Sequence, residues 1–366
     1  MTTQAVFKGW KGNDEKAVDG NLVFEEFEPK QWDEDDVEMK ILYCGICGTD
    51  AAALSGNFLP IESPQICGHE IVGEVVRVGN QVENGVKVGS LVGVGYQSDS
   101  CRECTECKSK NEHYCPNQTV TFNSPYHRGH GKDNQSKGGF AKYWRGPSRF
   151  TIPLPEGLSP EVAGPLMCGG VTVFTPLERF GIADATEPKN VGVIGVGGLG
   201  HMGILFAKAM GANVTAISRS NSKKDDAMKL GVDDYIATGE NLKDAFASYN
   251  RHFDLVIVTS NPPEFPINDY VSILKPKGAI CFVGIVPKPL ELGTISLISS
   301  NIVVTGSNIG SPEGIARMLK FAAEKKVSPW IQKWNMDDIN KAMLEFQKGN
   351  PRYRYVLVNT DNGGKL

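Results

Sequence analysis

Four cysteines stand within fifteen residues, in the pattern Cys101-x2-Cys104-x2-Cys107-x7-Cys115. Thiolate sulfur binds Zn²⁺ strongly, and four sulfurs this close along the chain can close a tetrahedron around one ion. A closed shell of four sulfurs leaves no position for a substrate, so the spacing predicts a structural zinc site. Iron–sulfur clusters use the same ligands, but the loop context and the dinucleotide motif described below favour zinc.

A second group of metal-binding residue types is dispersed along the chain. Cys47 lies in CGICGTD, His69 and Glu70 lie in CGHE, and Cys168 lies in MCGG. None of them is specific alone, because a single Cys or His is more often a buried packing residue than a ligand. Two thiolates and one imidazole would leave a fourth zinc position open for substrate, as catalytic zinc requires.

A glycine-rich hexapeptide separates an apolar segment, NVGVIG, from a helical one, LGHMGILFAKAMG. Its residues match G-x-G-x-x-G and are Gly195, Val196, Gly197, Gly198, Leu199 and Gly200. In this pattern the first glycine permits a tight turn, the second lets the backbone approach a pyrophosphate, and the third lets helix and strand pack closely. A packing turn could share this composition, but the strand–turn–helix context predicts a dinucleotide site.

The end of the next strand, NVTAIS, indicates which dinucleotide is bound. NAD sites usually place Asp or Glu there to accept the ribose hydroxyls, whereas the segment here has no acid before Asp225. Hydroxyls, a guanidinium and an ammonium suit a dianionic 2′-phosphate. A solvated basic loop is the alternative interpretation. The prediction is NADP(H), held by Ser218, Arg219, Ser220 and Lys223.

The elements that must position these residues form two patterns. Up to about Ser159, short segments rich in Val and Ile alternate with Gly and Pro, which predicts an irregular β-barrel-like domain; examples are 37–47, 70–79, 87–95 and 148–155. From about Pro188, apolar strands alternate with helical stretches such as 223–231, 267–276 and 312–326. That alternation predicts a parallel, doubly wound α/β sheet.

Composition excludes several classes of protein. A net charge of −4 over 366 residues gives no broad positive field, so nucleic acid and anionic membranes are not expected as partners. The N-terminal segment carries both charge signs and lacks an apolar export signal, and the longest apolar runs are broken by glycine, so a cytoplasmic location is expected. Nine cysteines in such a chain favour metal binding or burial over disulfides.

Taken together, these motifs resemble the zinc-containing medium-chain dehydrogenases, in which they occur in the same order. The segments GGFAKYWRG, MCGGVTVFTPL, AISRS, KPKGAI, TGSNIGS and RYRYVLV are similar to the cinnamyl alcohol dehydrogenase subfamily, and most closely to its fungal NADP-dependent, broad-specificity members. The resemblance extends from about Phe24 to Val358. It implies a GroES-like catalytic domain at 1–168 with the zinc lobe at 96–116, a Rossmann NADP domain at 169–306, and a return to the catalytic domain at 307–366.

The resemblance also implies residue roles. Catalytic zinc would be held by Cys47, His69 and Cys168, with Glu70 as an alternating ligand or a supporting carboxylate. Thr49 would hydrogen-bond the substrate oxygen, and Asp50 would orient His69. Two zinc ions per subunit and a homodimer formed through edge strands of the Rossmann sheet are expected. The nicotinamide cleft would be lined by Thr172, Thr259, Gly284, Ser307, Asn308 and Ile309.

One position departs from the family pattern. Many relatives carry a histidine five residues after the first zinc cysteine, where it passes the proton to solvent; here the residue is Ala52, which leaves the proton route beyond Thr49 open. Alignment to the family places Leu54, Phe58, Val120 and Phe122 near the substrate, although they could equally be core residues.

The function that follows is interconversion of primary alcohols and aldehydes by hydride transfer, with aromatic, cinnamyl and medium aliphatic aldehydes as expected substrates. Three alternatives are reduction of an iminium or a conjugated C=C bond, a zinc-free quinone reductase of the same fold, and a non-catalytic NADPH-binding protein. Thr49 favours the aldehyde, and the complete ligand and cofactor motifs disfavour the other two alternatives.

Overall fold

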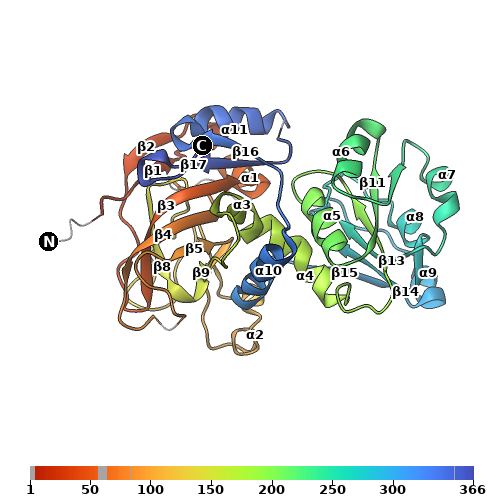
Figure 1. Ribbon diagram of the computed structural model, residues 1–366, viewed down its shortest axis with the longest axis horizontal. Helices are drawn as coiled ribbons and strands as arrows, with labels where there is room; N and C mark the ends of the chain where they lie inside the picture. Colours follow the sequence, from red (N-terminus) through yellow and green to blue (C-terminus); the bar gives the residue numbers. More distant parts are fainter. Residues whose placement is uncertain (1–4, 57–63, 83, 350) are drawn as a thin grey trace. The chain divides into compact units, whose positions relative to one another are not determined.

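The computed structural model describes residues 5–56, 64–82, 84–349 and 351–366. It divides into two compact units, Met1–Cys168 with Gly310–Leu366, and Gly169–Ile309. In Figure 1 the first unit runs from red to yellow and returns in dark blue, while the second runs from yellow-green to blue. The chain therefore leaves the first unit once and returns to it. The second unit ends at Ile309, whereas the sequence prediction ended it at residue 306.

The first unit is built on a seven-stranded sheet with the order β16-β17-β3-β4-β5-β9, and β8 also pairs with β3. Its neighbours are antiparallel except for β16 and β17. Two small antiparallel pairs, β1 with β2 and β6 with β7, also belong to this unit. The strands are β1 (Lys8–Lys11), β2 (Val23–Glu26), β3 (Asp36–Ile46), β4 (Glu70–Val78), β5 (Leu91–Val94), β6 (Gln97–Asp99), β7 (Thr119–Val120), β8 (Tyr143–Pro147), β9 (Ile152–Pro153), β16 (Ile331–Asn335) and β17 (Arg354–Val358).

Strand β3 carries the core of this unit, because it is buried on both faces. Met39 and Ile41 belong to one hydrophobic cluster, while Leu42 and Tyr43 belong to another. Side chains two residues apart share a face, as Met39 and Ile41 do, and a register shift between Ile41 and Tyr43 interrupts the alternation there. The strand expected over 148–155 is only partly formed: a 3₁₀ turn precedes the short β9. The helices of this unit are α1 (Gly48–Leu54), α2 (Thr105–Lys108), α3 (Pro160–Pro165), α10 (Pro312–Lys325) and α11 (Ile339–Gln347).

The second unit is a six-stranded parallel sheet with the order β12-β11-β10-β13-β14-β15. The order reverses direction between β10 and β13, the kind of point at which open α/β sheets bind ligands. The strands are β10 (Asn190–Ile194), β11 (Asn213–Ser218), β12 (Asp234–Ala237), β13 (Phe253–Val258), β14 (Leu274–Phe282) and β15 (Val303–Gly306). The helices are α4 (Val171–Arg179), α5 (Gly200–Ala209), α6 (Lys224–Lys229), α7 (Leu242–Phe246), α8 (Ile267–Val271) and α9 (Thr294–Ser300).

One helix of this unit is shorter than the sequence indicated. The helical pattern over 267–276 ends at Val271, and the chain enters β14 at Leu274. Pro276 disfavours the helical conformation of the residue before it, and Leu274 already pairs with Phe253 in the sheet. The helix predicted from apolar spacing was therefore too long at its C-terminal end, because it included the first residues of β14.

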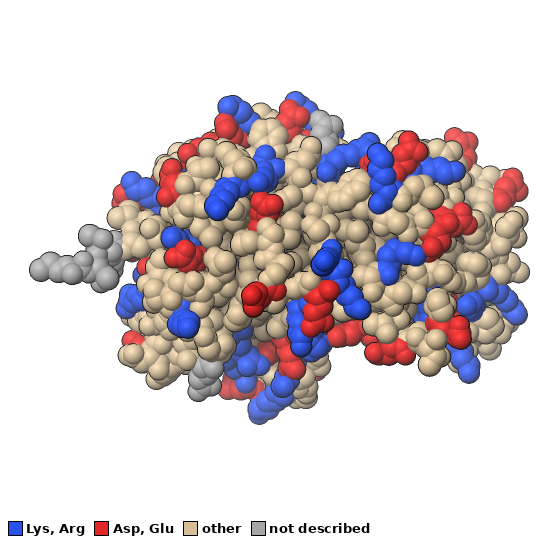
Figure 2. Space-filling model, in the orientation of Figure 1, with Lys and Arg blue, Asp and Glu red and all other residues tan. Residues whose placement is uncertain are grey.

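The surface carries both signs of charge, as the composition indicated. On the face drawn in Figure 2, Lys and Arg side chains are interspersed with Asp and Glu. Within the described part of the chain, no helix is both long and apolar enough to cross a membrane.

Candidate functional site

The four cysteines of the first motif converge in a loop that contains α2. Cys101, Cys104, Cys107 and Cys115 each offer a sulfur, and all four sulfurs lie within 4.8 Å of one another. The sulfurs of Cys101 and Cys115 are 3.5 Å apart, and those of Cys101 and Cys107 are 3.9 Å apart. Sulfurs placed tetrahedrally about 2.3 Å from one zinc would be about 3.8 Å apart. The spacing therefore fits a Cys₄ zinc site.

Backbone groups orient these sulfurs. The N–H of Cys104 donates to Cys101 Sγ at 3.4 Å, and the N–H of Cys107 donates to Cys104 Sγ at 3.5 Å. Burial raises the pKa of Cys101, but N–H donation from Glu103 and Cys104 outweighs it and holds that pKa at about 7. Burial raises the pKa of the Cys115 thiol to about 12. A divalent cation would favour the thiolate form of all four.

Ion pairs fasten this lobe to the rest of the first unit. Arg102 contacts Asp35 at 2.8 Å, and Lys110 contacts Glu313 of α10 at 3.0 Å. Arg149 pairs with Glu112, a carboxylate that is only 1% exposed. These contacts reach three other segments of the unit. Ion pairs therefore attach the lobe to the rest of the first unit, in addition to the four cysteines inside the lobe.

Replacing Cys104 by alanine is expected to abolish metal binding by this lobe. Zinc content should fall by one ion per chain, and the free energy of unfolding should decrease on the order of 3 kcal/mol or more, since loss of a structural metal is among the most destabilising changes. Metal analysis and thermal unfolding measure both effects. Thr105→Ala, which changes the adjacent exposed residue, should alter neither. Full zinc content in the Cys104 variant would contradict the assignment.

The dispersed metal-binding residues also come together, within the first unit. Ligand atoms of Cys47, His69, Glu70 and Cys168 all lie within 4.8 Å of one another. Cys47 stands between β3 and α1, His69 and Glu70 open β4, and Cys168 lies in a π-helical turn over Leu166–Gly170. His69 Nε2 is 3.3 Å from Cys168 Sγ. Three separate segments thus build one cluster.

Asp50 orients two members of this cluster. Its Oδ1 lies 2.8 Å from His69 Nδ1 and accepts the Gly68 N–H at 2.8 Å, while its Oδ2 accepts the Cys47 N–H at 2.9 Å. A hydrogen bond from Nδ1 to this carboxylate directs Nε2 at the sulfurs, where a bound metal would replace the proton on that nitrogen. Burial lowers the pKa of His69, but the Asp50 carboxylate outweighs it and raises that pKa well above its usual value.

The two thiols of the cluster differ in pKa. The hydrogen bond between them lowers the pKa of Cys47 well below its ordinary value and raises that of Cys168 well above it. Cys47 is half-buried and Cys168 is buried. Two sulfurs and one imidazole nitrogen in this arrangement have the chemistry of a Cys₂His zinc site.

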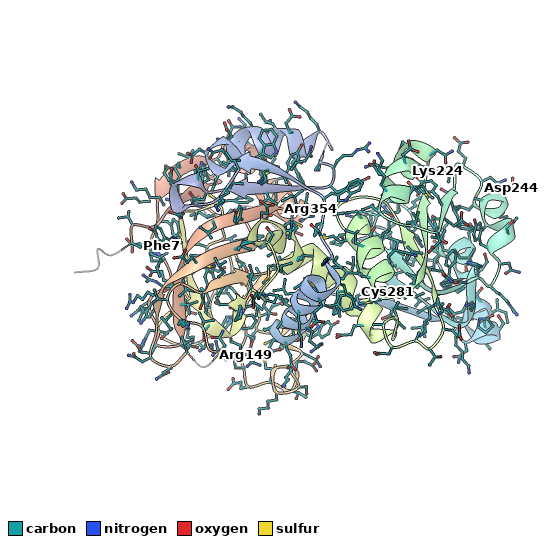
Figure 3. The ribbon with its side chains drawn as sticks, in the orientation of Figure 1. Phe7, Arg149, Lys224, Asp244, Cys281 and Arg354 are labelled. Carbon is teal, nitrogen blue, oxygen red and sulfur yellow. The ribbon has the colours of Figure 1, made fainter. Side chains whose placement is uncertain are left out.

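Arg354, on β17, is a member of this site that the sequence did not indicate. It forms an ion pair with Glu70, and its side chain is 6% exposed; Figure 3 labels it. Burial raises the pKa of Glu70 to about 7, against the opposing charge of Arg354. The other carboxylate oxygen, Oε2, is buried and has no hydrogen-bond partner among the described residues. An added Cβ on Gly45 would meet that oxygen. Glycine at this position therefore leaves room for the Glu70 carboxylate, and the free oxygen of that carboxylate suits a bound cation.

The remaining predicted residues of the first unit have different surroundings. Cys47 Sγ lies 3.8 Å from the hydroxyl of Thr49. Phe122 is buried with its ring 5.8 Å from that of His69, whereas Leu54 is completely buried in the core, which makes it a packing residue. Phe58 lies outside the described residues.

In the second unit, the glycine turn lies between β10 and α5 as predicted. Gly195 has φ +94°, a left-handed conformation that favours glycine, and a Cβ on Gly200 would collide with the Gly195 carbonyl oxygen. A Cβ on Gly197 would meet nothing within 4 Å. The first and third glycines are thus required by the fold, and the space beside the second is open to a ligand.

A cavity of about 630 Å³ adjoins this turn. Gly195, Ser218 and Arg219 line it, and so does Glu240, an acid that follows β12; NAD sites place their ribose-binding acid after the second strand instead. The Ser220 hydroxyl lies 3.0 Å from that of Ser222, and the Tyr235 hydroxyl donates to the Ser220 carbonyl at 2.6 Å. Tyr235, which the sequence did not indicate, holds the loop that carries the predicted NADP contacts.

The other predicted cofactor residues also belong to this unit. Thr259 donates to the carbonyls of Ile194 and Gly195 at 2.8 and 3.1 Å, and so holds the glycine turn. Thr172 is buried on α4, and a Cβ on Gly284 would collide with Asn261. The remaining members, at the end of the unit after β15, are Ser307, Asn308 and Ile309.

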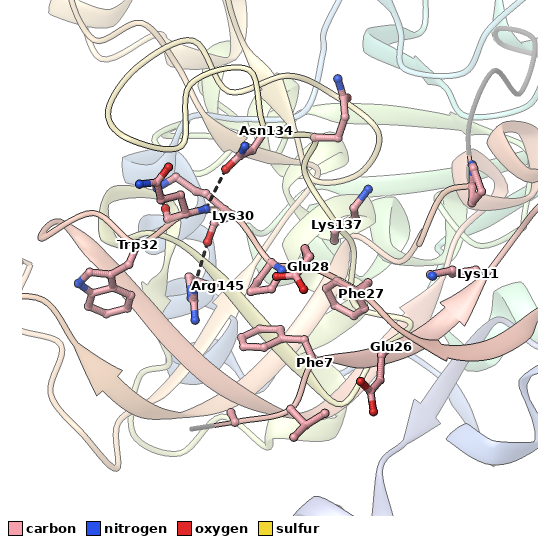
Figure 4. A pocket seen from close by; sticks show the side chains of 16 residues that line it. Phe7, Lys11, Glu26, Phe27, Glu28, Lys30, Trp32, Asn134, Lys137 and Arg145 are labelled. Carbon is pink, nitrogen blue, oxygen red and sulfur yellow. Dashed lines mark hydrogen bonds between the residues drawn. The ribbon is translucent and has the colours of Figure 1, made fainter. Parts of the chain in front are cut away.

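A larger open cavity has a volume of about 1010 Å³, and no residue of either cysteine cluster lines it; Figure 4 shows its lining side chains. Phe7, Phe27 and Trp32 line it together with basic side chains. Of these, Lys30 already contacts two aspartates at 2.7 Å, and Arg145 pairs with Glu38 at 2.8 Å. This cavity is larger than the one beside the glycine turn, but it is not the reactive site, because neither cysteine cluster lines it.

The chain is similar to known dehydrogenases in sequence and in fold. Residues 33–156 match the family described as alcohol dehydrogenase GroES-like domain, and residues 198–324 match zinc-binding dehydrogenase. The chain is 38% identical over 339 residues to NADP-dependent alcohol dehydrogenase 6 of Saccharomyces cerevisiae, with 92% of each chain covered. A cinnamyl alcohol dehydrogenase of Sorghum bicolor matches with a TM-score of 0.88 at 36% identity, covering 99% of each chain. A CAD of Helicobacter pylori, complexed with NADP(H), matches with a TM-score of 0.83 at 28% identity, covering 97% of this chain and 99% of that one.

Proposed function

The chain belongs to the zinc-containing medium-chain alcohol dehydrogenases of the cinnamyl alcohol dehydrogenase type, and from this membership we propose that it is an NADP(H)-dependent enzyme that interconverts primary alcohols and aldehydes. In the reductive direction an aldehyde, NADPH and one proton give the alcohol and NADP⁺. The observation that carries the proposal is the cluster of Cys47, His69 and Cys168, with Asp50 holding the imidazole.

When bound, Zn²⁺ would supply Lewis-acid polarisation of the carbonyl oxygen, and NADPH would supply the hydride. Cys47, His69 and Cys168 would hold the metal, and Glu70 would lie beside it with its charge balanced by Arg354. The Thr49 hydroxyl, close to Cys47 Sγ, would donate a hydrogen bond to the substrate oxygen. Cys101, Cys104, Cys107 and Cys115 would hold the structural zinc.

The substrate class is aromatic, cinnamyl and medium aliphatic aldehydes. With the zinc-loaded enzyme and NADPH, benzaldehyde, cinnamaldehyde and hexanal should be reduced with kcat/KM of about 10⁴ M⁻¹s⁻¹ or more, in the ordinary range for enzymes. Loss of NADPH absorbance measures the rate. A cyclic iminium and an enone are the comparison substrates, and turnover confined to them would overturn the proposal.

A second copy of the chain is the proposed partner. Strand β15 is an edge of the six-stranded sheet, and the preceding α9 exposes Ile295 and Ile298, at 71% and 77%. An unpaired strand edge beside apolar side chains suits symmetric pairing with an identical edge. Ile298→Glu should convert a dimer into a monomer in light scattering, whereas Val88→Glu, at an exposed apolar position of the first unit, should not. A monomeric wild type would refute this.

The cytoplasm is the proposed location. Both zinc clusters need their cysteines as thiolates, and a reducing compartment keeps thiols available for metal.

A further inference from the structure

Tyr96 lies beside the Cys47–His69–Cys168 cluster, in a backbone segment that Thr121 holds through two hydrogen bonds. It stands between β5 and β6. Its carbonyl accepts the Thr121 N–H at 2.8 Å, and the Thr121 hydroxyl donates to the carbonyl of Gly95 at 2.5 Å. The residue therefore has a fixed position relative to the strands of the first unit.

The ring of Tyr96 packs edge-on against the imidazole of His69. The two ring centres are 5.3 Å apart with planes at 84°, and Phe122 lies 6.3 Å from Tyr96 and 5.8 Å from His69. Aromatic rings in such edge-to-face contacts hold one another in place. Three rings thus fix the direction in which the phenol extends.

Tyr96 is half-buried, and its hydroxyl makes no hydrogen bond with any described residue. That oxygen is not among the buried atoms that lack a partner, so it is open to solvent. Phenols are protonated at neutral pH, so the hydroxyl is a hydrogen-bond donor that is open to a ligand, on a ring that contacts the imidazole of His69.

Building on the proposed function, we propose that the Tyr96 hydroxyl donates a hydrogen bond to the reacting oxygen of the aldehyde, so that Tyr96 is a further catalytic residue beside Thr49. Negative charge grows on that oxygen as hydride reaches the carbonyl carbon, and a donor already in position stabilises it.

The same contact selects for carbonyl compounds. A carbonyl oxygen accepts a hydrogen bond, whereas the nitrogen of an iminium ion has no lone pair to accept one. A phenol donor therefore assists the reduction of an aldehyde and does not assist the reduction of an iminium. The substrate class expected for this site is accordingly carbonyl compounds.

The test is Tyr96→Phe, which keeps the ring against His69 and removes only the hydroxyl. In the zinc-loaded enzyme, kcat/KM for benzaldehyde should fall about 10- to 100-fold, with the zinc content unchanged. Benzamide, an unreactive compound with a similar carbonyl oxygen, should bind to the NADPH complex about 5- to 10-fold more weakly in calorimetry. Tyr143→Phe, which changes a half-buried phenol on β8, should alter neither quantity.

The two readouts separate this inference from the proposed function. A wild type that reduces no aldehyde refutes the proposed function, while a benzamide affinity that depends on Tyr96 would still support the hydrogen bond. A wild type that reduces aldehydes, with a Tyr96→Phe variant equal to it in both kcat/KM and benzamide affinity, refutes the role of Tyr96. A loss of zinc in the variant would also refute it, because the hydroxyl would then be structural.

Discussion

Replacing Cys168 by alanine is expected to empty the catalytic cluster of zinc and to lower kcat for aldehyde reduction by about 10³-fold or more. The sulfur lies 3.3 Å from His69 Nε2 and belongs to the set of four donors. Without it, one imidazole and one thiolate remain beside the Glu70 carboxylate, which Arg354 already engages. Lewis-acid polarisation contributes several kcal/mol, and about 4 kcal/mol corresponds to 10³-fold in rate. Metal analysis should show one zinc per chain where the wild type has two.

Cys281→Ala is the matched control for this experiment. Cys281 is another buried thiol, on β14 of the second unit, and Figure 3 labels it. Its replacement removes the same atom type without touching either cluster, so zinc content and kcat should both be preserved. An active Cys168 variant with two zinc ions would show that the cluster is not the catalytic metal site.

The second large effect concerns the cofactor. Ser218→Asp combined with Arg219→Ala is expected to lower the preference for NADPH over NADH, measured as the ratio of kcat/KM values, by about 10²- to 10³-fold. Both residues line the cavity beside the glycine turn. The change removes a guanidinium that suits a 2′-phosphate and places a carboxylate where NAD sites carry one. Charge-assisted hydrogen bonds contribute about 1.5–3 kcal/mol each, which sets the size of the effect.

Lys229→Asp controls for net charge in the cofactor experiment, because it changes the charge by −2, as the double variant does. Lys229 ends α6 and does not line the cavity beside the glycine turn. It should leave the cofactor ratio unchanged, and aldehyde reduction with the double variant and NADH would show that the fold survives. An unchanged preference in the double variant would instead make Ser218 and Arg219 part of a solvated loop.

Two motifs could be predicted from the sequence because each is local. The four cysteines of the structural lobe lie within fifteen residues, so chain connectivity alone brings their sulfurs near one another. The glycine turn is similar: its conformation depends on residues that are neighbours in the chain, and a Cβ on Gly200 would meet the carbonyl of Gly195. The alternation of strands and helices from residue 188 onward predicted the parallel sheet for the same reason.

Only the tertiary structure decided which distant side chains meet. His69 and Cys168 are 99 residues apart, and Glu70 and Arg354 are 284 apart. Antiparallel pairing of β17 with β3, and of β3 with β4, brings Arg354 to Glu70, through partners such as Tyr355 with Ile46 and Gly45 with Glu70. Cys168 reaches His69 from a separate π-helical turn, Leu166–Gly170. Strand register has no counterpart in local composition, because it depends on the burial of whole sheet faces. For that reason the sequence could assign the catalytic zinc ligands only by resemblance, and it did not indicate Arg354 or the unpartnered hydroxyl of Tyr96.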